Sequence, residues 1–175
     1  MSTIETLYSS RWLTLLRRGH WEFIRRPHSE SCVVILPLLN GDTVVLIEQF
    51  RIPLQQRVIE LPAGLVGDEP DYAHESITET AMRELREETG YHAQHMSLLL
   101  STPTSAGMTS EITHVFQATD LIRVSDGGGV ADEEIVIHHV PLIQLRSWLD
   151  EKAHQGVRID FKIHALSLIH ISEPT

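Results

Sequence analysis

The chain has 175 residues, 42 % of them hydrophobic, which predicts one soluble domain with a sizeable core. A formal net charge of −10 argues against a nucleic-acid-binding surface, which is normally basic. The single cysteine excludes an internal disulfide. With no signal peptide and no apolar run near about eighteen residues, we expect a cytoplasmic protein.

The first half of the chain is predicted to be β-structure. RWLTLLRRG (11–19) and HWEFIRRP (20–27) indicate an antiparallel pair joined around the glycine. CVVILPLL (32–39) and TVVLIEQFR (43–51) are β-branched runs separated by Asn-Gly-Asp, a strong hairpin signal. VIELPAGLV (58–66) predicts a short strand that enters a loop.

The second half mixes one long helix with further strands. A helix is predicted over residues 71–89, ended by Gly90, because glycine readily adopts the left-handed conformation of a helix terminus. A proline begins a final helix with apolar spacing in LIQLRSWLDEKAHQ. No βαβ repetition is present, so the pattern predicts an α+β domain with a mixed sheet. Short strands are expected near residues 97–100, 113–118 and 135–140.

The last ten residues, LSLIHISEPT, match a conceptual translation of a transposase-type sequencing adapter. We interpret residues 166–175 as an artefact of a truncated metagenomic read and exclude them from functional reasoning. The natural protein is expected to continue differently after about Ala165.

The segment MRELREETGY (82–91) carries negative side chains at positions where a helix disfavours them. It places three glutamates at the carbonyl end of the helix, which already carries partial negative charge: Glu84, Glu87 and Glu88. Arg83 stands four residues from Glu79 and from Glu87, so ordinary ion pairs on a solvated face are one interpretation. Between residues 60 and 90, however, nine acidic residues face two basic ones. A divalent cation with oxygen ligands, Mg²⁺ or Mn²⁺, would balance the surplus charge.

The spacing of these residues resembles the signature of the Nudix hydrolases: Glu, seven residues, Arg-Glu-apolar-x-Glu-Glu-x-Gly-apolar. The matching positions are Glu75, Arg83, Glu84, Leu85, Glu87, Glu88, Gly90 and Tyr91. This signature, here called the box, normally begins with a glycine, but the corresponding position is Glu69 in this chain. Gly64 can take that role only if about five residues are inserted in the loop, and a loop insertion costs little free energy. The resemblance covers most of residues 5–165. It implies a mixed β-sheet sandwiched between helices, with an N-terminal antiparallel β subdomain.

The resemblance also implies a metal site and a base. Glu84 and Glu88 would be the main metal ligands, with the main-chain carbonyl of Ala63 joining them. Glu87, beside them, would be a further ligand and a catalytic residue. Arg83 would orient Glu87, or serve only as an ion-pair partner. The catalytic base would come from the loop SDGGGVADEEIV, where Glu133 is the first match and Glu134 the second. For either residue, the alternative is a solvated charge on the loop with no catalytic role. The three glycines of that loop lack the Lys-Ser/Thr of a P-loop and are interpreted as a hinge.

WEFIRRP, VVLIEQFR and VIELPAGLV resemble the ADP-ribose pyrophosphatase branch of that family. The branch implies that Trp12 and Trp21 sandwich adenine across the interface of a homodimer, or else that they only fill a core or interface. Arg26 and Arg51 would contact phosphate or ribose, with a plain surface charge as the alternative. Glu60 would touch ribose or metal, or have a structural role.

Metal-dependent hydrolysis of ADP-ribose to AMP and ribose 5-phosphate is the favoured function. Residues 105–107, Ser-Ala-Gly, stand where related enzymes often have Ser-Pro-Gly, so another nucleoside diphosphate sugar (GDP-mannose or UDP-glucose type) is an alternative. A non-catalytic nucleotide-sensing Nudix-like domain is a minor alternative, since it would normally have lost a box carboxylate. Residues 1–30 are expected to form a strand region for dimerisation and substrate binding, residues 31–165 the Nudix domain, and residues 166–175 the artefactual tail.

Overall fold

The computed structural model describes residues 3–129 and 134–165, so Glu133 and the adapter-like tail lie outside the described residues. The chain divides into two compact units. Unit 1 comprises Met1–Val34, Ala63–Ala81 and Leu98–Phe116, and unit 2 comprises Ile35–Pro62, Met82–Ser97 and Gln117–Thr175.

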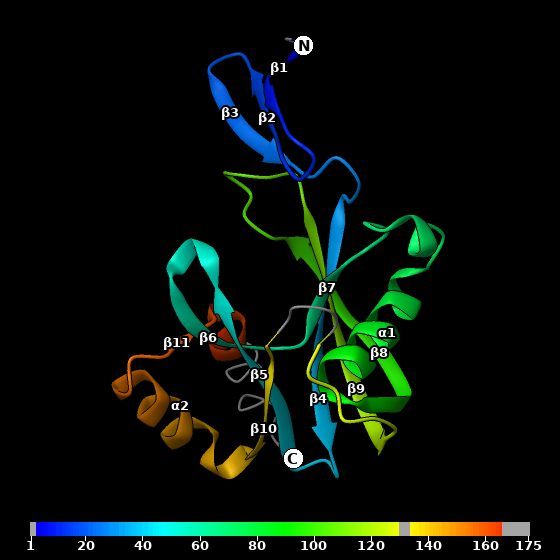
Figure 1. The fold of residues 1–175 in the computed structure, drawn as a ribbon, viewed down its shortest axis with the longest axis vertical. Coiled ribbons are helices and arrows are strands. Elements are labelled where there is room, and N and C mark those ends of the chain that lie inside the picture. The colour runs from blue at the N-terminus through cyan, green and yellow to red at the C-terminus, as the bar shows by residue number, and fades with distance from the viewer. Residues whose placement is uncertain (1–2, 130–133, 166–175) are drawn as a thin grey trace. The chain divides into compact units, whose positions relative to one another are not determined.

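A three-stranded antiparallel sheet opens unit 1 (Figure 1). Its order is β1 (Ile4–Ser9), β2 (Thr14–Arg18) and β3 (Trp21–Arg25). The predicted β2–β3 pair is confirmed, with Gly19 between the strands at φ 63°. Strand β1 was not predicted, because its six residues carry few β-branched side chains and a charge, and they are mostly exposed.

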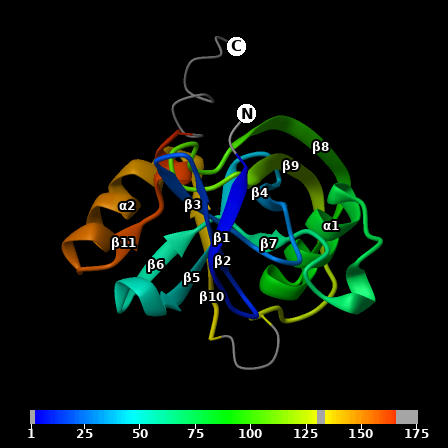
Figure 2. The same ribbon diagram turned by 90° about the horizontal axis from the view of Figure 1, so that it is seen from above.

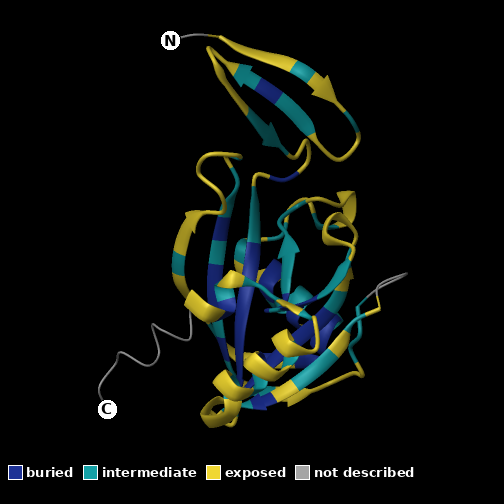
Figure 3. Ribbon diagram, turned by 90° about the vertical axis from the view of Figure 1, so that its left-hand side faces the viewer, coloured by how far each residue is buried: buried dark blue, intermediate teal, exposed yellow. Residues whose placement is uncertain are grey.

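The remaining strands form a mixed sheet in the order β11-β6-β5-β4-β9-β8, with β10 paired to β5 and β7 to β4. Buried Val, Ile and Leu side chains of β4 and β5 supply much of the core (Figure 3). The β4–β5 turn uses Asn40 and Gly41, both at positive φ, which confirms the hairpin expected from Asn-Gly. The bounds are β4 Ser31–Leu39, β5 Thr43–Arg51, β6 Gln56–Glu60, β7 Ala63–Leu65, β8 Tyr91–Pro103, β9 Ile112–Arg123, β10 Val136–Pro141 and β11 Arg158–Ile159.

The helices include α1 (Ile77–Thr89) and α2 (Leu145–His154), and residues 161–165 are also helical. Within unit 2, α2 packs against β10 and β11, and residues 82–89 of α1 lie on the other side of β5 and β10 (Figure 1 and Figure 2). The predicted α+β fold, a mixed sheet with helices plus an N-terminal antiparallel sheet, is confirmed. Across the described residues, no helix combines the length and apolar character needed to cross a membrane.

The predicted start of α1 at residue 71 is wrong, since the helix begins at Ile77. Pro70 instead starts a separate 3-10 turn. Ser76 and Glu79 then cap α1 reciprocally: the Ser76 N–H donates to Glu79 Oε2 at 2.8 Å, and the Glu79 N–H donates to Ser76 Oγ at 3.2 Å. Ser-x-x-Glu is a recognisable capping box, so the sequence did contain the correct start. Glu79 therefore caps the helix, a role that its expected pairing with Arg83 did not include.

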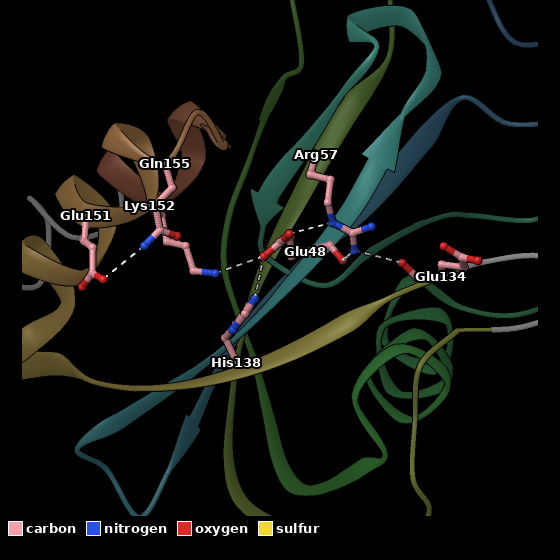
Figure 4. Close-up of polar contacts among 7 residues, drawn as sticks. All are labelled: Glu48, Arg57, Glu134, His138, Glu151, Lys152 and Gln155. Atoms are coloured by element: carbon pink, nitrogen blue, oxygen red, sulfur yellow. Dashed lines mark hydrogen bonds and ion pairs between the residues drawn. The ribbon is translucent and has the colours of Figure 1, made fainter.

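A buried ionic cluster in unit 2 joins β5, β6, β10 and α2 around Glu48, which is only 7 % exposed (Figure 4). Arg57 Nε lies 2.6 Å from Glu48 Oε1, while His138 Nε2 and Lys152 Nζ lie 2.9 and 3.3 Å from Oε2. The Trp148 ring packs edge-on against His138, with ring centroids 5.0 Å apart. One carboxylate thus holds together groups from three other elements.

Burial alone would raise the pKa of Glu48, but hydrogen bonds from Arg57 and His138 and the charge of Lys152 outweigh it and lower the pKa below 4.5. Burial lowers the pKa of His138 below 6.5. In both cases the unfolded chain binds protons more readily than the folded one. Their stabilisation is therefore complete above pH 6.5 and is lost as the pH falls, first through His138 and then through Glu48.

We predict that Glu48→Gln lowers the free energy of unfolding by about 2–3 kcal/mol at pH 7, because Arg57 and Lys152 lose the charge that offsets their burial; partial exposure of both keeps the loss below that of a fully buried pair. The acid-side loss of stability should also become shallower. Urea denaturation between pH 4 and 7 measures both effects. Glu151→Gln on the exposed side of α2 is the control, expected within about 0.5 kcal/mol of wild type. Equal stability of the two variants would contradict this role for Glu48.

Candidate functional site

The last two turns of α1 carry three glutamates within unit 2. Glu84 and Glu88 are four residues apart and so share one face of the helix, with Glu87 next to them. The side chains of Glu84 and Glu87 are 15 % and 20 % exposed, and Glu88 is buried at 5 %. Burial of carboxylates is costly unless cationic or hydrogen-bonding groups compensate it.

Arg83 is paired with two of these glutamates. Its Nη1 lies 2.8 Å from Glu84 Oε1 and 3.0 Å from Glu87 Oε2, and its side chain is 10 % exposed. The ion pair with Glu87 expected from the spacing is present; the role of orienting Glu87 stays a prediction. Within the part of the chain that the structure describes, no three or more His, Cys, Asp or Glu side chains converge as a finished metal site.

The donor chemistry of this helix end nevertheless fits a hard divalent cation. Three carboxylates, partly or fully withdrawn from water, occupy five consecutive residues, and Arg83 pairs with two of them. Carboxylate oxygens are the ligands that Mg²⁺ and Mn²⁺ take. A cation at Glu84, Glu87 and Glu88 would also reduce the repulsion between carboxylates one turn apart.

Two other predicted site residues meet in unit 2. Arg51, the last residue of β5, donates from Nε to Glu60 Oε2 at 2.8 Å, and Glu60 is the last residue of β6. The two strands pair in antiparallel fashion. Glu60 is 13 % exposed and Arg51 43 % exposed. A guanidinium has five N–H donors in a planar fork, so one Nε contact leaves it able to bind an anion as well.

Unit 1 contains both predicted adenine-stacking residues. Trp21, the first residue of β3, donates from its indole Nε1 to the carbonyl of Gly107 at 3.0 Å and is 54 % exposed. Trp12 lies between β1 and β2, is 67 % exposed, and has the Arg11 guanidinium 4.6 Å from its ring centroid. Both rings present large apolar surfaces to solvent. The contact with Gly107 belongs to the Ser-Ala-Gly segment singled out in the sequence.

Arg26 is also in unit 1 and pairs with an acid that no sequence pattern indicated. Its Nε lies 3.0 Å from Glu111 Oε2, and Glu111 is 13 % exposed. Glu111 Oε1 accepts a long contact of 3.9 Å from Cys32 Sγ. No local pattern distinguishes Glu111 from other loop acids, because its partners are 85 and 79 residues away in the sequence.

The remaining predicted positions are Ala63 and the two candidate loop acids, Glu133 and Glu134. Ala63 begins β7 in unit 1 and pairs with Val34 of β4, so its position is set by the sheet. Glu134 lies in unit 2, is exposed, and its carbonyl accepts a hydrogen bond from Arg57 Nη2 at 3.4 Å. Glu133, the first choice for the base, lies outside the described residues.

Comparison with known proteins gives the family. Residues 28–160 match the NUDIX domain. A methanol dehydrogenase activator of Bacillus methanolicus and an ADP-ribose pyrophosphatase of Bacillus subtilis are 35 % and 34 % identical over 117 residues, covering 66 % of this chain and 58 % of each relative. A GDP-mannose pyrophosphatase of Cronobacter sakazakii is 36 % identical over 141 residues, covering 75 % of this chain and 68 % of the relative.

A crystal structure of an ADP compounds hydrolase superimposes with a TM-score of 0.68 at 25 % identity, covering 83 % of this chain and 80 % of that one. The chain spans less than two thirds of the length of the two Bacillus relatives. The domain match, by contrast, includes the whole of α1 and the strands β4–β11 that surround it in the sequence. This chain therefore belongs to the Nudix family.

Proposed function

We propose that the protein is a divalent-metal-dependent pyrophosphohydrolase that cleaves ADP-ribose to AMP and ribose 5-phosphate. The observation that carries the proposal is the complete set of box carboxylates on the last two turns of α1, with Arg83 paired to two of them. The relative named ADP-ribose pyrophosphatase, 34 % identical, supports the substrate class.

Glu84, Glu87 and Glu88 would hold Mg²⁺ or Mn²⁺, and the family pattern adds the carbonyl of Ala63. Such an ion, when bound, neutralises charge on the diphosphate and eases deprotonation of the attacking water. Arg83 keeps Glu87 in place through its 3.0 Å contact. A loop acid, Glu133 or in second place Glu134, takes the proton of the water, which requires only hydrogen-bond reach to it.

The substrate would be held by the other predicted residues. Trp12 and Trp21 offer exposed rings on which adenine stacks. Arg26 and Arg51 offer guanidinium forks, each fixed by an acid, for phosphate or ribose oxygens. Glu60 pairs with Arg51 and is 13 % exposed. It would contact ribose or the metal, or would serve only to position Arg51.

GDP-mannose is the second candidate, favoured by a specific observation. The GDP-mannose pyrophosphatase of Cronobacter sakazakii is as similar in sequence, at 36 % identity, and more of this chain aligns to it. Stacking on tryptophan does not separate adenine from guanine, since both present a π-face. Contacts to the sugar and to the hydrogen-bonding edge of the base must therefore distinguish ADP-ribose from GDP-mannose.

The first prediction from this proposal concerns metal and substrate. With Mg²⁺, the protein should convert ADP-ribose to AMP and ribose 5-phosphate, and excess EDTA should abolish turnover because the diphosphate charge is then not neutralised. Chromatographic product analysis with ADP-ribose, GDP-mannose and UDP-glucose should give kcat/KM for ADP-ribose about tenfold or more above the others. Turnover that persists in EDTA would refute the mechanism, and a preference for GDP-mannose would replace the substrate.

The second prediction concerns Glu88. Glu88→Gln should keep the far-UV circular dichroism spectrum of wild type, because loss of a negative charge at the carbonyl end of α1 relieves repulsion. Its kcat should fall by about a hundredfold or more, because one anionic ligand is lost. Glu30→Gln, an exposed glutamate outside the box, is the control and should leave kcat unchanged. A near wild-type rate for Glu88→Gln would remove this residue from the metal site.

The third prediction concerns assembly. Ile4, Tyr8, Trp12 and Trp21 are exposed on or beside the β1-β2-β3 sheet, which suits an interface between two copies of the chain. If the two tryptophans of one site come from different subunits, mixing Trp12→Ala with Trp21→Ala should restore roughly one quarter of the wild-type sites. Light scattering should show a homodimer. A fully active monomer, or a mixture no better than its components, would contradict the shared site.

A further inference from the structure

The last turn of α1 has main-chain carbonyl groups that need hydrogen-bond donors from outside the helix. A helix leaves its last four carbonyl groups without partners within the helix. Here two of those carbonyls belong to Glu87 and Glu88, whose side chains already oppose the negative end of the helix dipole. A turn with such charges would fray unless donors from elsewhere satisfy it.

Those donors come from the three consecutive glycines at residues 127–129, here called the glycine clasp. The Gly128 N–H donates to the Glu88 carbonyl at 3.0 Å, and the Gly129 N–H donates to the Glu87 carbonyl at 3.0 Å. The Gly90 carbonyl just beyond the helix accepts from Val124 N–H at 2.8 Å. All of these residues lie in unit 2. A segment some forty residues later in the chain therefore caps the helix that bears the glutamates.

The contact between the clasp and the end of α1 requires that neither Gly127 nor Gly90 carries a side chain. A Cβ on Gly127, whose φ is +67°, would lie 2.5 Å from both the Gly90 nitrogen and the Thr89 carbonyl carbon. A Cβ on Gly90, at φ +77°, would collide with the Ser125 carbonyl oxygen. Real Cβ atoms do not approach backbone atoms so closely, so one of the two backbone segments would have to move. At Gly128 the nearest atom to a Cβ, the Ile135 carbonyl oxygen, is 4.0 Å away.

The same clasp is tied to the strand that follows it. The Ile135 N–H donates to the Gly128 carbonyl at 3.4 Å, and Arg57 Nη2 donates to the Glu134 carbonyl at 3.4 Å. Glu134 is the described candidate for the loop acid. The backbone on one side of the clasp therefore contacts the glutamate-bearing turn, and on the other it contacts the start of the acid-bearing segment.

We propose that the glycine clasp is a positioning segment for the active site: its N–H groups hold Glu87 and Glu88 in the metal-binding register, and its bond to Ile135 keeps Glu134 at a set place relative to them. The proposal rests on the proposed function of those glutamates. It assigns residues 127–129 a fixed role, in addition to the hinge expected from sequence.

The test compares three glycine-to-alanine variants. Gly127→Ala introduces both the strain of positive φ and the collision with the end of α1, whereas Gly128→Ala introduces strain with ordinary contacts. Gly41→Ala is the matched control in the β4–β5 turn, because Gly41 has φ +78° and a Cβ added there would meet no atom within 4 Å. The measurements are Mn²⁺ affinity by electron paramagnetic resonance, kcat and KM, and thermal stability.

Gly127→Ala is expected to weaken Mn²⁺ binding and to lower kcat, each by about tenfold or more, the effect typical of lost support for a metal ligand. KM for the nucleotide sugar should stay within about twofold, since the clasp contacts none of the proposed substrate-binding residues in the described part of the chain. Gly128→Ala should have a smaller effect, and Gly41→Ala should match wild type in Mn²⁺ affinity and kcat. Equal Mn²⁺ affinity for Gly127→Ala and Gly41→Ala would overturn the proposal.

A measurement on the wild-type protein decides the matter if Gly127→Ala does not fold. By linkage, a clasp that favours metal binding must itself be stabilised by metal, so amide exchange at Gly128 and Gly129 should slow by about tenfold on adding Mn²⁺. Unprotected amides, or exchange unaffected by bound Mn²⁺, would overturn the clasp. A protein that binds Mn²⁺ with this slowing but hydrolyses no nucleotide sugar would refute the proposed function and support the clasp. Absence of Mn²⁺ binding would refute both.

Discussion

The electrostatic imbalance at the end of α1 is the constraint on which the rest of the site depends. Three carboxylates are crowded where the helix dipole is already negative, and one of them, Glu88, is buried. The guanidinium of Arg83 pairs with Glu84 and Glu87, and the N–H groups of the glycine clasp donate to the main-chain carbonyls of Glu87 and Glu88. Under the proposed function, a cation at this helix end would offset the remaining negative charge.

A second regularity is that the two arginines predicted to bind substrate are each paired with an acid that is 13 % exposed. Arg26 pairs with Glu111 in unit 1, and Arg51 pairs with Glu60 in unit 2. In each pair the acid is far less exposed than the arginine. Such an acid limits the rotamers of a long side chain, so less entropy would be lost if, as proposed, the guanidinium binds a phosphate. An acidic protein can bind an anionic substrate in this way, because local charge rather than net charge faces the ligand.

The family assignment and the choice of substrate have different physical bases. Hydrolysis of a diphosphate, as proposed, would depend on the carboxylates of α1, whereas relatives of similar identity carry names with different substrates. The nucleotide and the sugar are distinguished by hydrogen bonds at their edges, and a missing hydrogen bond in a buried site costs far more than a change in stacking. The residues proposed to hold the nucleotide and sugar, such as Trp21 and Arg51, are not part of the box. This is why the box alone supports the chemistry more strongly than the substrate.

Local rules account for what could be predicted. The register of α1 and the position of its glutamates follow from spacings of three, four and seven residues, and the β4–β5 turn follows from Asn40 and Gly41. The start of α1 was also encoded locally, by Ser76 and Glu79, although the proline-led turn before it was taken for helix. Strand β1 escaped prediction because its residues carry only a weak strand signal.

The contacts that set the site in place were decided by tertiary structure. Glu48 meets His138 and Lys152, which are 90 and 104 residues away, and Glu111 meets Arg26 across 85 residues. At position 127 glycine is favoured by its positive φ, and the backbone of Thr89 and Gly90, which lies against it, excludes a Cβ as well. Sequence by itself determined which side chains share a turn of helix, since that depends on neighbours within a few residues. Which distant backbone completes that turn depends on how the chain folds back on itself, and no local spacing records it.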